Sequence, residues 1–303
     1  MLLMDCATFA AEITRSIGTL PGQLEVAARY VLENPGDVAL LSMREQARRA
    51  GVQPWTMTRL AKRFGLDGYE AVRELHGKAL KEQALGFAGR AGAQMARQRE
   101  AGGPMLAKEI ASAAACQIFA LGEAGAAHTL FEAAQAMARA RRVYCVGLRS
   151  SRPVAEHLAY MLNFLGEKAV YLDFSDGVGL DALRFATQDD LVFVVTVAPY
   201  TRAAVEAARH AHARSLSIIA LTDRPASPVA RLARHAILVG TESPSFFHAM
   251  APAFAAVEIL AALVAGEGGD AALEVIARTE RQLSDLKVHV FEYGSAHRQG
   301  NHS

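Results

Sequence analysis

Two hydrophobic patterns divide the chain. In the first 80 residues the apolar positions recur with helical spacing only, and one such run predicts an amphipathic helix that ends near Asn34 and Pro35. That run consists of Leu24, Ala27, Ala28, Val31 and Leu32. Farther along, short apolar runs alternate with helical stretches, which is typical of βα units. The pattern therefore predicts an all-α N-terminal domain followed by an α/β domain.

Five short apolar runs in the second part predict strands, and each is followed by helical spacing. They are Val143–Val146, Ala169–Leu172, Leu191–Val197, Ile218–Leu221 and Ala236–Val239. Strands with so few polar positions are buried on both faces, as in parallel sheets covered by helices. We therefore expect a doubly wound, flavodoxin-like, parallel five-stranded sheet.

The N-terminal part contains a candidate helix-turn-helix. Ser42 and Glu45 form a capping box, in which the Ser42 hydroxyl caps the helix and Glu45 returns to the cap amide. The helix Met43–Ala50 ends at Gly51, which can adopt a positive φ, and a second helix begins at Pro54. The apolar positions that lock the second helix against the first are Val52, Met57 and Leu60.

The exposed side of this second helix predicts contact with DNA. Between Met43 and Arg63 there are six basic residues and one acid, an excess of five positive charges that suits phosphate neutralisation. Gln and Arg pair with base edges, and Thr contacts a thymine methyl or a phosphate. The candidate DNA-binding residues are Arg44, Arg48, Gln53, Trp55, Thr56, Thr58, Arg59 and Lys62. The alternatives are a solvated helical hairpin without a DNA role, and a packing role for Trp55.

The composition of the whole chain conceals this basic segment. Lys and Arg total 32 and Asp and Glu total 31, so the 303 residues carry a formal net charge of +1. That balance excludes a protein that is basic along its whole length, and it leaves a local basic face possible.

The remaining composition predicts a cytoplasmic protein with no membrane span. The three cysteines stand far apart, so we expect unpaired thiols in a reducing compartment, no metal site and no cofactor. No basic region precedes the apolar part of the N-terminus, unlike a signal peptide. The longest apolar stretch, from Met250 to Ala265, is interrupted by Pro252 and Glu258.

A change in composition separates the domains. The Ala/Gly/Arg/Gln-rich segment from Ala84 to Gly103 is weakly patterned, which indicates an interdomain connection, and Pro104 to Leu121 is helical again. We therefore expect a DNA-binding domain at residues 1–80, a helical linker at 81–125, a ligand-binding α/β domain at 126–288 and a flexible tail at 289–303.

The stretch from Leu20 to about Leu80 resembles the N-terminal DNA-binding domain of the RpiR family of phosphosugar-responsive transcription regulators. The resemblance rests on ENPGDVALLSMREQARRAGVQPWTMTRLAKRFGLDGYEAVREL, of which the part from Arg59 onward is the more specific. It implies a winged-helix-like or plain three-to-five-helix domain that binds a double-stranded DNA operator as a dimer. Gln53-Pro54-Trp55 replaces the Ser-rich helix start usual in that family, so the operator need not match that of a relative.

From about His128 to Leu286 the chain resembles the sugar isomerase (SIS) domain that follows this helix-turn-helix in the same family. The resemblance includes the strand Val143–Val146 with the loop after it, and IIALTDRPASPVARLARHAILV. It implies a small anionic effector, a sugar phosphate or a related metabolite. Independently, ligands of open parallel sheets bind beyond the carboxyl ends of the strands, where helix starts suit anions. The candidate ligand-binding residues are Gly147, Arg149, Ser150, Ser151, Thr196, Tyr200, Thr201 and Arg202.

Two loops depart from the SIS pattern. Arg149 stands at the second glycine of the usual G-x-G-x-S turn, and the usual S-x-S-G-x-T loop, here Thr196 to Thr201, has lost one hydroxyl and its glycine. Arg149 and Arg202 can replace backbone dipoles by charge, which favours an anion of different shape. The alternatives are helix capping alone for Ser151 and Thr201, and a surface or interdomain salt bridge for Arg149.

An enzyme is the alternative function, because SIS domains also occur in aldose–ketose isomerases of sugar phosphates. Enediol chemistry needs a carboxylate base and a ring-opening histidine, for which the candidates are Glu156, His157, His248 and Glu258. We expect a non-enzymatic regulator with no catalytic residue, in which ligand binding changes the placement of two DNA-binding domains. The helix around Phe247–Ala265 is apolar nearly all round, which indicates a homodimer or homotetramer interface. A binding or scaffold protein without DNA function is a third possibility.

Overall fold

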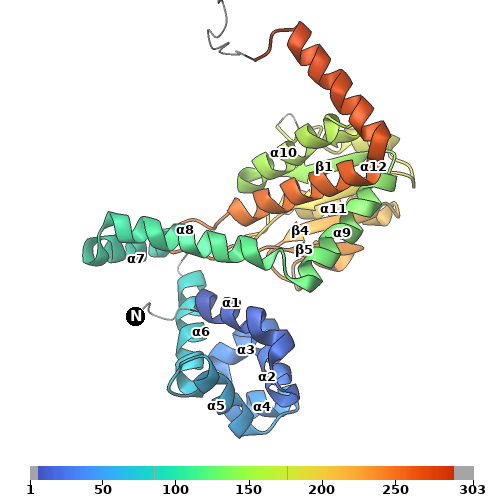
Figure 1. Cartoon of the computed structure of the whole chain (residues 1–303). Helices are drawn as coiled ribbons and strands as arrows, with labels where there is room; N and C mark the ends of the chain where they lie inside the picture. Colours follow the sequence, from blue (N-terminus) through green and yellow to red (C-terminus); the bar gives the residue numbers. More distant parts are fainter. Residues whose placement is uncertain (1–5, 85, 176, 290–303) are drawn as a thin grey trace, which may run out of the picture.

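The computed structural model describes residues 6–84, 86–175 and 177–289. A helical N-terminal domain lies below an α/β domain, and an arm of two helices connects them (Figure 1). The predicted tail at 289–303 lies outside the described residues, apart from His289.

The N-terminal domain is entirely helical, as predicted. Its elements are α1 (Cys6–Ser16), a short 3-10 turn (Ile17–Thr19), α2 (Gly22–Glu33), α3 (Pro35–Leu40), α4 (Met43–Ala50), α5 (Pro54–Arg63) and α6 (Tyr69–Ala84). The apolar stripe of α2 turns inward and joins one core with Phe9, Ile13, Met57 and Leu60. These four side chains are fully buried, which fixes the rotation of α1 and α5.

A buried polar contact ties three of these helices together. The Gln46 side chain in α4 donates to the carbonyl oxygens of Val38 at 3.1 Å and Leu41 at 2.8 Å. The Tyr69 hydroxyl at the start of α6 donates to Gln46 Oε1 at 2.6 Å. Because both side chains are buried, these bonds replace water and hold α3, α4 and α6 in register.

The weakly patterned segment, which we expected to belong to a helical linker, is helical. α7 (Gly86–Ala101) and α8 (Gly103–Ala120) form the two-helix arm (Figure 1). Gly102 has a φ of 86°, which permits the sharp reversal between them. Arg97 and Glu109 form an ion pair of 2.7 Å across the arm. The predicted helix from Pro104 to Leu121 therefore corresponds to α8.

The α/β domain contains the predicted sheet. Its elements are α9 (Ala124–Arg139), β1 (Val143–Gly147), a 3-10 turn (Arg149–Ser151), α10 (Arg152–Asn163), β2 (Ala169–Tyr171), a 3-10 turn (Asp181–Phe185), β3 (Leu191–Val195), α11 (Arg202–Ala213), β4 (Ser217–Thr222), a 3-10 turn (Ala230–Leu232), β5 (His235–Leu238) and α12 (Ala251–Asp285). All strand pairs are parallel, in the order β2-β1-β3-β4-β5. The doubly wound, flavodoxin-like prediction is confirmed.

Alternate residues of each strand enter two separate cores, as the apolar runs require. Cys145 and Phe193 face α9, α10 and the first half of α12. Tyr144 and Val192 face α11 on the other side of the sheet. Both faces of the sheet are therefore covered, and its carboxyl edge carries the loops that can bind a ligand.

The last helix changes direction at one residue. Gly269 in α12 has a φ of 51° and a ψ of −138°, and the part after it extends away from the α/β domain (Figure 1). Among the described residues, α12 is the one single helix that is long and apolar enough to cross a membrane. Its Val257, Leu260 and Val264 are buried against the sheet and α9, as in the core helix of a globular domain.

Candidate functional site

The turn between α4 and α5 has the geometry that the sequence predicts. α4 ends at Gly51, whose φ of 69° is left-handed, and the Val52 amide donates back to the Ala47 carbonyl at 2.9 Å. Val52 is buried, and α5 begins at Pro54 without needing its missing N–H. The two helices are thus held as a tight pair by one glycine, one apolar anchor and one proline.

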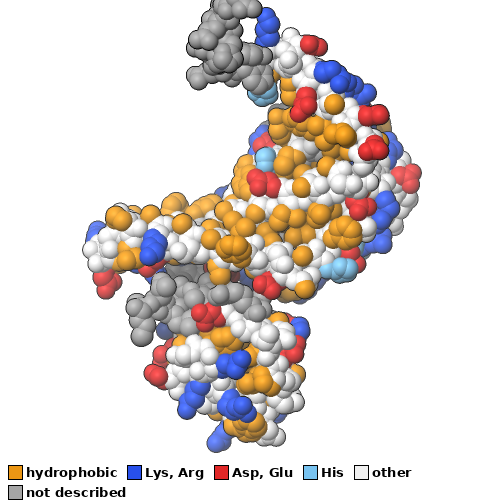
Figure 2. All heavy atoms as spheres, viewed as in Figure 1, with side chains coloured by type: hydrophobic (Ala, Val, Ile, Leu, Met, Phe, Trp, Pro, Cys, Tyr) orange, Lys and Arg blue, Asp and Glu red, His pale blue; other side chains and the backbone are white. Residues whose placement is uncertain are grey.

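One face of α5 is exposed and basic. Trp55, Arg59, Lys62 and Arg63 recur at the spacing of one helix face and all are exposed, Trp55 by 55%. The Arg59 guanidinium lies 5.1 Å from the Trp55 ring centre, within range of a cation–π contact. Figure 2 shows Lys and Arg side chains at the end of the N-terminal domain that is far from the α/β domain, where α4 and α5 lie. The packing alternative for Trp55 is therefore not supported.

Two of the predicted DNA-binding residues are not on that face. Thr56 is 1% exposed and belongs to the buried side of α5, so its prediction as an exposed contact is wrong. Thr58 is half-buried, and its hydroxyl lies 3.5 Å from Met43 Sδ. Because α5 packs against α2, α4 and α6, its buried arc is wider than that of a helix with one partner.

The basic excess on α4 is partly neutralised within the domain. Arg48 and Arg49 both pair with Glu45, at 2.6 Å and 3.0 Å, and Arg49 also pairs with Asp37 at 2.8 Å. Hydrogen bonds from the two arginines lower the pKa of Glu45 to about 2. The Ser42 hydroxyl accepts from the Glu45 amide as predicted, but the Glu45 carboxylate binds the arginines instead of completing the capping box.

The cations that remain available lie at the edge of α4 and on α5. Arg44, Lys62 and Arg63 are exposed and form no ion pair with any residue that the structure describes. Gln53 is exposed at the start of α5. Together with Arg59, these side chains form the candidate DNA interface.

The candidate ligand site lies at the carboxyl edge of the sheet. β1 and β3 are neighbours in the sheet, so the loops that follow them come together, as the sequence predicts. Gly147, which ends β1, approaches the Ser151 carbonyl so closely that a Cβ atom would lie 2.4 Å from its oxygen. This close approach brings the start of α10 onto the end of β1 and positions the loop residues between them.

Arg149 occupies a glycine-like backbone position. Its φ is 57°, in the left-handed region, although it carries a side chain. Arg149 therefore combines the left-handed backbone conformation that favours glycine with an exposed guanidinium. Arg149 is exposed and forms no ion pair with the described residues, so the salt-bridge alternative is not supported.

Ser150 connects the β1 loop to the loop after β5. Its hydroxyl lies 2.8 Å from His248 Nε2, and His248 is only 9% exposed. Burial and then the positive charge of Arg90 lower the pKa of His248, while the negative charge of Asp223 opposes them. The imidazole is therefore neutral at pH 7, and its Nδ1 is buried without a hydrogen bond to any described residue.

The loop after β3 is held from within. The Thr196 side-chain oxygen accepts from the Thr201 amide at 3.3 Å, and the Thr222 hydroxyl donates to the Thr196 carbonyl at 2.7 Å. Tyr200 lies half-buried in the loop, and its pKa is raised to about 12 by burial and then by the Asp223 carboxylate. Tyr200 and Asp223 thus bring the ends of β3 and β4 together, and the negative charge of Asp223 also acts on His248, which contacts Ser150.

The other predicted ligand residues have simpler surroundings. Ser151 and Thr201 occupy the positions before α10 and α11, but neither side chain caps its helix, so capping alone does not explain them. Ser151 is buried, Thr201 is half-buried, and Arg202 is exposed at the first position of α11. Gly147 is the last residue of β1, and the other seven predicted residues follow β1 or β3.

The catalytic candidates other than His248 contact neighbouring side chains. Glu156 accepts from Arg152 at 2.8 Å on the surface of α10. His157 lies 3.6 Å from Glu258 of α12, and its ring also contacts Phe254. His157 and Glu258 therefore form a separate pair from the Ser150–His248 contact.

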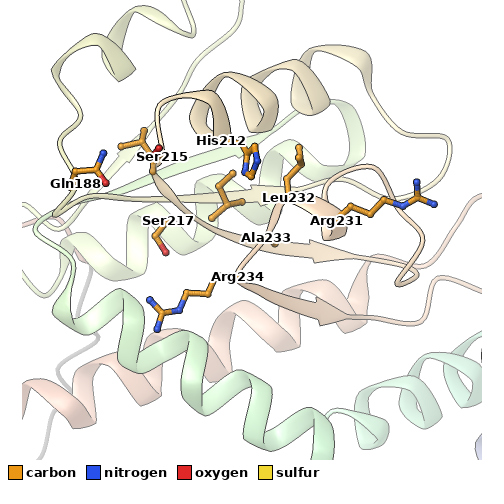
Figure 3. A pocket seen from close by; sticks show the side chains of 10 residues that line it. Gln188, His212, Ser215, Ser217, Arg231, Leu232, Ala233 and Arg234 are labelled. Atoms are coloured by element: carbon orange, nitrogen blue, oxygen red, sulfur yellow. The ribbon is translucent and has the colours of Figure 1, made fainter.

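An open depression lies at the opposite edge of the sheet. Its lining includes Ser215 and Ser217 at the amino end of β4 (Figure 3). It also includes Arg231 and Arg234, which lie just before β5. The two guanidinium groups point away from each other, so they do not form one anion site (Figure 3). Since ligands of such sheets bind at the carboxyl edge, this depression is not the candidate site.

Three residues of the cluster were not assigned as ligand residues from sequence. Asp223 follows β4 and His248 lies in the β5–α12 loop, so a search of all strand ends would have found them. Arg90 lies on α7, and nothing in its local pattern indicates that it reaches the sheet.

Comparison with known proteins is consistent with this architecture. Residues 136–265 match the SIS domain family. The sugar isomerase domain of an RpiR transcription factor from Sphaerobacter thermophilus is 30% identical, with a TM-score of 0.48, over 51% of this chain and 86% of that one. The NanR protein of Vibrio vulnificus, solved in complex with ManNAc-6P, is 22% identical, with a TM-score of 0.54, over 92% of this chain and 98% of that one.

A more distant similarity is to MJ1247 of Methanococcus jannaschii, for which a 3-hexulose-6-phosphate isomerase function is inferred. It is 16% identical, with a TM-score of 0.43, over 60% of this chain and 97% of that one. No curated protein matches the chain significantly. The NanR similarity spans both domains, so the order of helical domain, arm and α/β domain is an arrangement found in another solved protein.

Proposed function

We propose, from the match of residues 136–265 to the SIS domain family, that the protein is a DNA-binding transcriptional regulator whose SIS domain senses a small anionic metabolite. The effector class that fits best is a sugar phosphate or a related anion. Binding of the effector at the carboxyl edge of the sheet then modulates binding of α5 to a double-stranded DNA operator.

The observation that carries this proposal is the exposed basic face of α5. Trp55, Arg59, Lys62 and Arg63 lie on one side of the second helix of a tight helical pair. In helix-turn-helix proteins that helix enters the major groove, where arginine binds guanine edges and phosphates. An isomerase has no need of such a face, because its substrate carries few charges and is bound in a pocket.

The effector class is supported by the cluster at the strand ends and by a relative. Hydroxyl, imidazole and guanidinium groups from the loops after β1, β3 and β5 suit a ligand that is both anionic and hydroxylated. The NanR protein of similar fold is complexed with ManNAc-6P. Pro199 and Tyr200 make the β3 loop of this chain different from the usual SIS loop. The sugar that this chain binds therefore need not be the one bound by NanR.

Substitution of Arg59 tests the DNA part of the proposal. Arg59→Ala should weaken binding to a duplex from the flanking genomic region roughly tenfold or more, since one base or phosphate contact contributes about 1–3 kcal/mol. Arg209→Ala is the matched control, because Arg209 is an exposed arginine on α11 that pairs with Glu206. Equal binding by the parent and Arg59→Ala would reject the assignment of α5.

An isomerase is the second candidate, and the His157–Glu258 pair favours it. These residues place an imidazole and a carboxylate 3.6 Å apart, the two groups that ring opening and enediol formation require. The test is turnover of a panel of aldose and ketose phosphates by the parent and by Glu258→Gln. Turnover that disappears in the variant would establish the enzyme.

We also propose that the protein is a homo-oligomer and that it is located in the cytoplasm. Ile118, Phe119 and Phe131 are exposed on α8 and α9, Phe119 by 78%. Figure 2 shows hydrophobic side chains gathered over α8 and α12 on this face of the molecule. Such a contiguous apolar surface fits a subunit interface, and two DNA-binding domains suit the two half-sites of an operator.

A further inference from the structure

The first turns of α7 lie against the loop that follows β5. Phe87 stacks on Phe247, with ring centres 5.1 Å apart and planes inclined by 16°. The Gln94 side chain accepts a hydrogen bond of 2.9 Å from the Phe246 amide. A helix of the arm is therefore fixed to a loop of the α/β domain, 152 residues away in sequence.

Arg90 lies on the same part of α7 and reaches the candidate ligand site. Its guanidinium carbon is 4.8 Å from the Phe87 ring centre, and its Nε is buried without a hydrogen bond to any described residue. The same Phe87 ring lies 6.3 Å from the His248 ring, centre to centre, so Phe87 places Arg90 and His248 in one neighbourhood. The positive charge of Arg90 accordingly helps to lower the pKa of His248. An arginine Nε without a partner is costly when buried unless another group accepts from it.

A second buried polar atom without a partner lies nearby, on His248. His248 Nδ1 has no hydrogen bond to the described residues, although His248 is more than nine-tenths buried and its Nε2 contacts Ser150. The Tyr200 hydroxyl is also buried, and the Asp223 carboxylate beside it helps to raise its pKa. Each of these groups can bind a phosphate or sugar oxygen, and they come from three separate segments of the chain.

The β3 loop itself offers little for an anion. Pro199 has no amide hydrogen, and the Thr196 side-chain oxygen already accepts from the Thr201 amide at 3.3 Å. Asp223 adds a negative charge beside Tyr200 and is balanced by Arg224 at 2.9 Å. A positive group from outside the sheet is therefore needed to bind an anion here.

We propose that Arg90, on the linker helix α7, binds the anionic group of the effector together with His248, so that the ligand site extends beyond the SIS domain into the arm. This inference rests on the proposed sensing function. Arg90 supplies the positive charge that the β3 loop does not provide, and the ligand that fits such a site is a phosphorylated sugar.

The position of Arg90 also gives the effector a route to the DNA-binding domain. α7 follows α6 after a single intervening residue, and α6 packs against α5 in the N-terminal domain. A ligand that binds Arg90 and the SIS loops at once stabilises one placement of α7. It thereby shifts the population of placements of α5 by its differential affinity for them.

Calorimetric titration of the full-length protein tests the inference. The probes are ManNAc-6P, glucose 6-phosphate and inorganic phosphate, each compared with the unphosphorylated sugar. The variants are Arg90→Ala, Arg90→Lys and Arg99→Ala, the last a control on the exposed end of the same helix. Melting without ligand verifies that each variant folds.

The expected result is tight binding of a phosphosugar by the parent and by Arg99→Ala, at least tenfold weaker binding by Arg90→Ala, and partial recovery by Arg90→Lys. Equal affinity of the parent and Arg90→Ala would overturn the inference and leave the sensing function intact. Failure of the parent to bind any of the three anions would overturn both.

Discussion

The hydroxyl of Ser150 lies 2.8 Å from Nε2 of His248, so the loop after β1 is joined to the loop after β5 across the carboxyl edge of the sheet. Ser150→Ala removes this contact and leaves a buried imidazole nitrogen without a partner. We expect a loss of about 1 kcal/mol of unfolding free energy and roughly tenfold weaker phosphosugar binding. Denaturant unfolding and calorimetry measure the two effects, and unchanged effector affinity would remove Ser150 from the site.

The buried His76 predicts that stability falls in mild acid. Its Nδ1 lies 2.8 Å from the Val72 carbonyl, but burial outweighs this bond and lowers the pKa below 6.5. The unfolded chain therefore binds a proton more readily than the folded one, so the free energy of unfolding decreases as pH falls below about 6.5, down to the lowered pKa of the folded state. Above pH 6.5 this contribution is constant.

The variant His76→Gln isolates this effect from those of His235 and His248, whose pKa values are also lowered by burial. Unfolding of the parent and the variant should be compared at pH 7.5 and pH 5. The parent should lose more stability than the variant between the two values. An equal loss would show that His76 does not titrate as described.

Trp55 and Thr56 are adjacent in sequence, but Trp55 is exposed and Thr56 is buried. Variants at these two positions should therefore distinguish an effect on DNA binding from an effect on folding. Trp55 is 55% exposed and Thr56 is 1% exposed. Trp55→Ala should weaken duplex binding about tenfold with little change in melting temperature, whereas Thr56→Arg should unfold the domain because it buries a charge. Anisotropy titrations and thermal melts provide the readout; destabilisation by Trp55→Ala would instead support a packing role for the indole.

Mutation of the buried Gln46 should strongly destabilise the N-terminal domain, although we assign Gln46 no contact with a ligand. Gln46→Ala leaves the Val38 and Leu41 carbonyls and the Tyr69 hydroxyl without their partner. We expect it to lose about 2–4 kcal/mol of unfolding free energy, against about 1 kcal/mol for the matched variant Tyr69→Phe. Chemical denaturation measures both; equal, small losses would mean that water replaces these bonds.

Replacement of Arg149 by glycine should increase the stability of the fold and weaken effector binding. Because its φ is 57°, Arg149→Gly removes backbone strain and should stabilise the fold by about 1 kcal/mol. The same change removes a guanidinium from the β1 loop, so phosphosugar affinity should fall. A variant that is more stable and binds the effector as tightly as the parent would show that Arg149 has no role in the ligand site.

The strands and the helix pair could be predicted because local pattern determines them. The five apolar runs could only be buried on both faces, and Gly51 and Pro54 mark the turn by their backbone preferences alone. Thr56 was placed on the wrong face of α5 because the rotation of that helix is set by its packing against α2, α4 and α6.

The composition of the ligand cluster depends on contacts that no local pattern encodes. His248 lies in a loop without periodicity, and Arg90 lies on a helix whose sequence indicated only a connection. Their meeting depends on the Phe87–Phe247 stack, which joins segments far apart in the chain. Tertiary packing, and not residue spacing, brings them to the strand ends.

The central claim is that an anionic metabolite bound at the strand ends changes how α5 binds DNA. The most direct measurement is fluorescence anisotropy of the full-length protein with a duplex from its own flanking region, at several salt concentrations, with and without a phosphosugar. The account predicts binding that weakens steeply as salt increases and an operator affinity that changes severalfold when the phosphosugar is added. Absence of duplex binding at low salt, or an affinity that no phosphosugar alters, would contradict it.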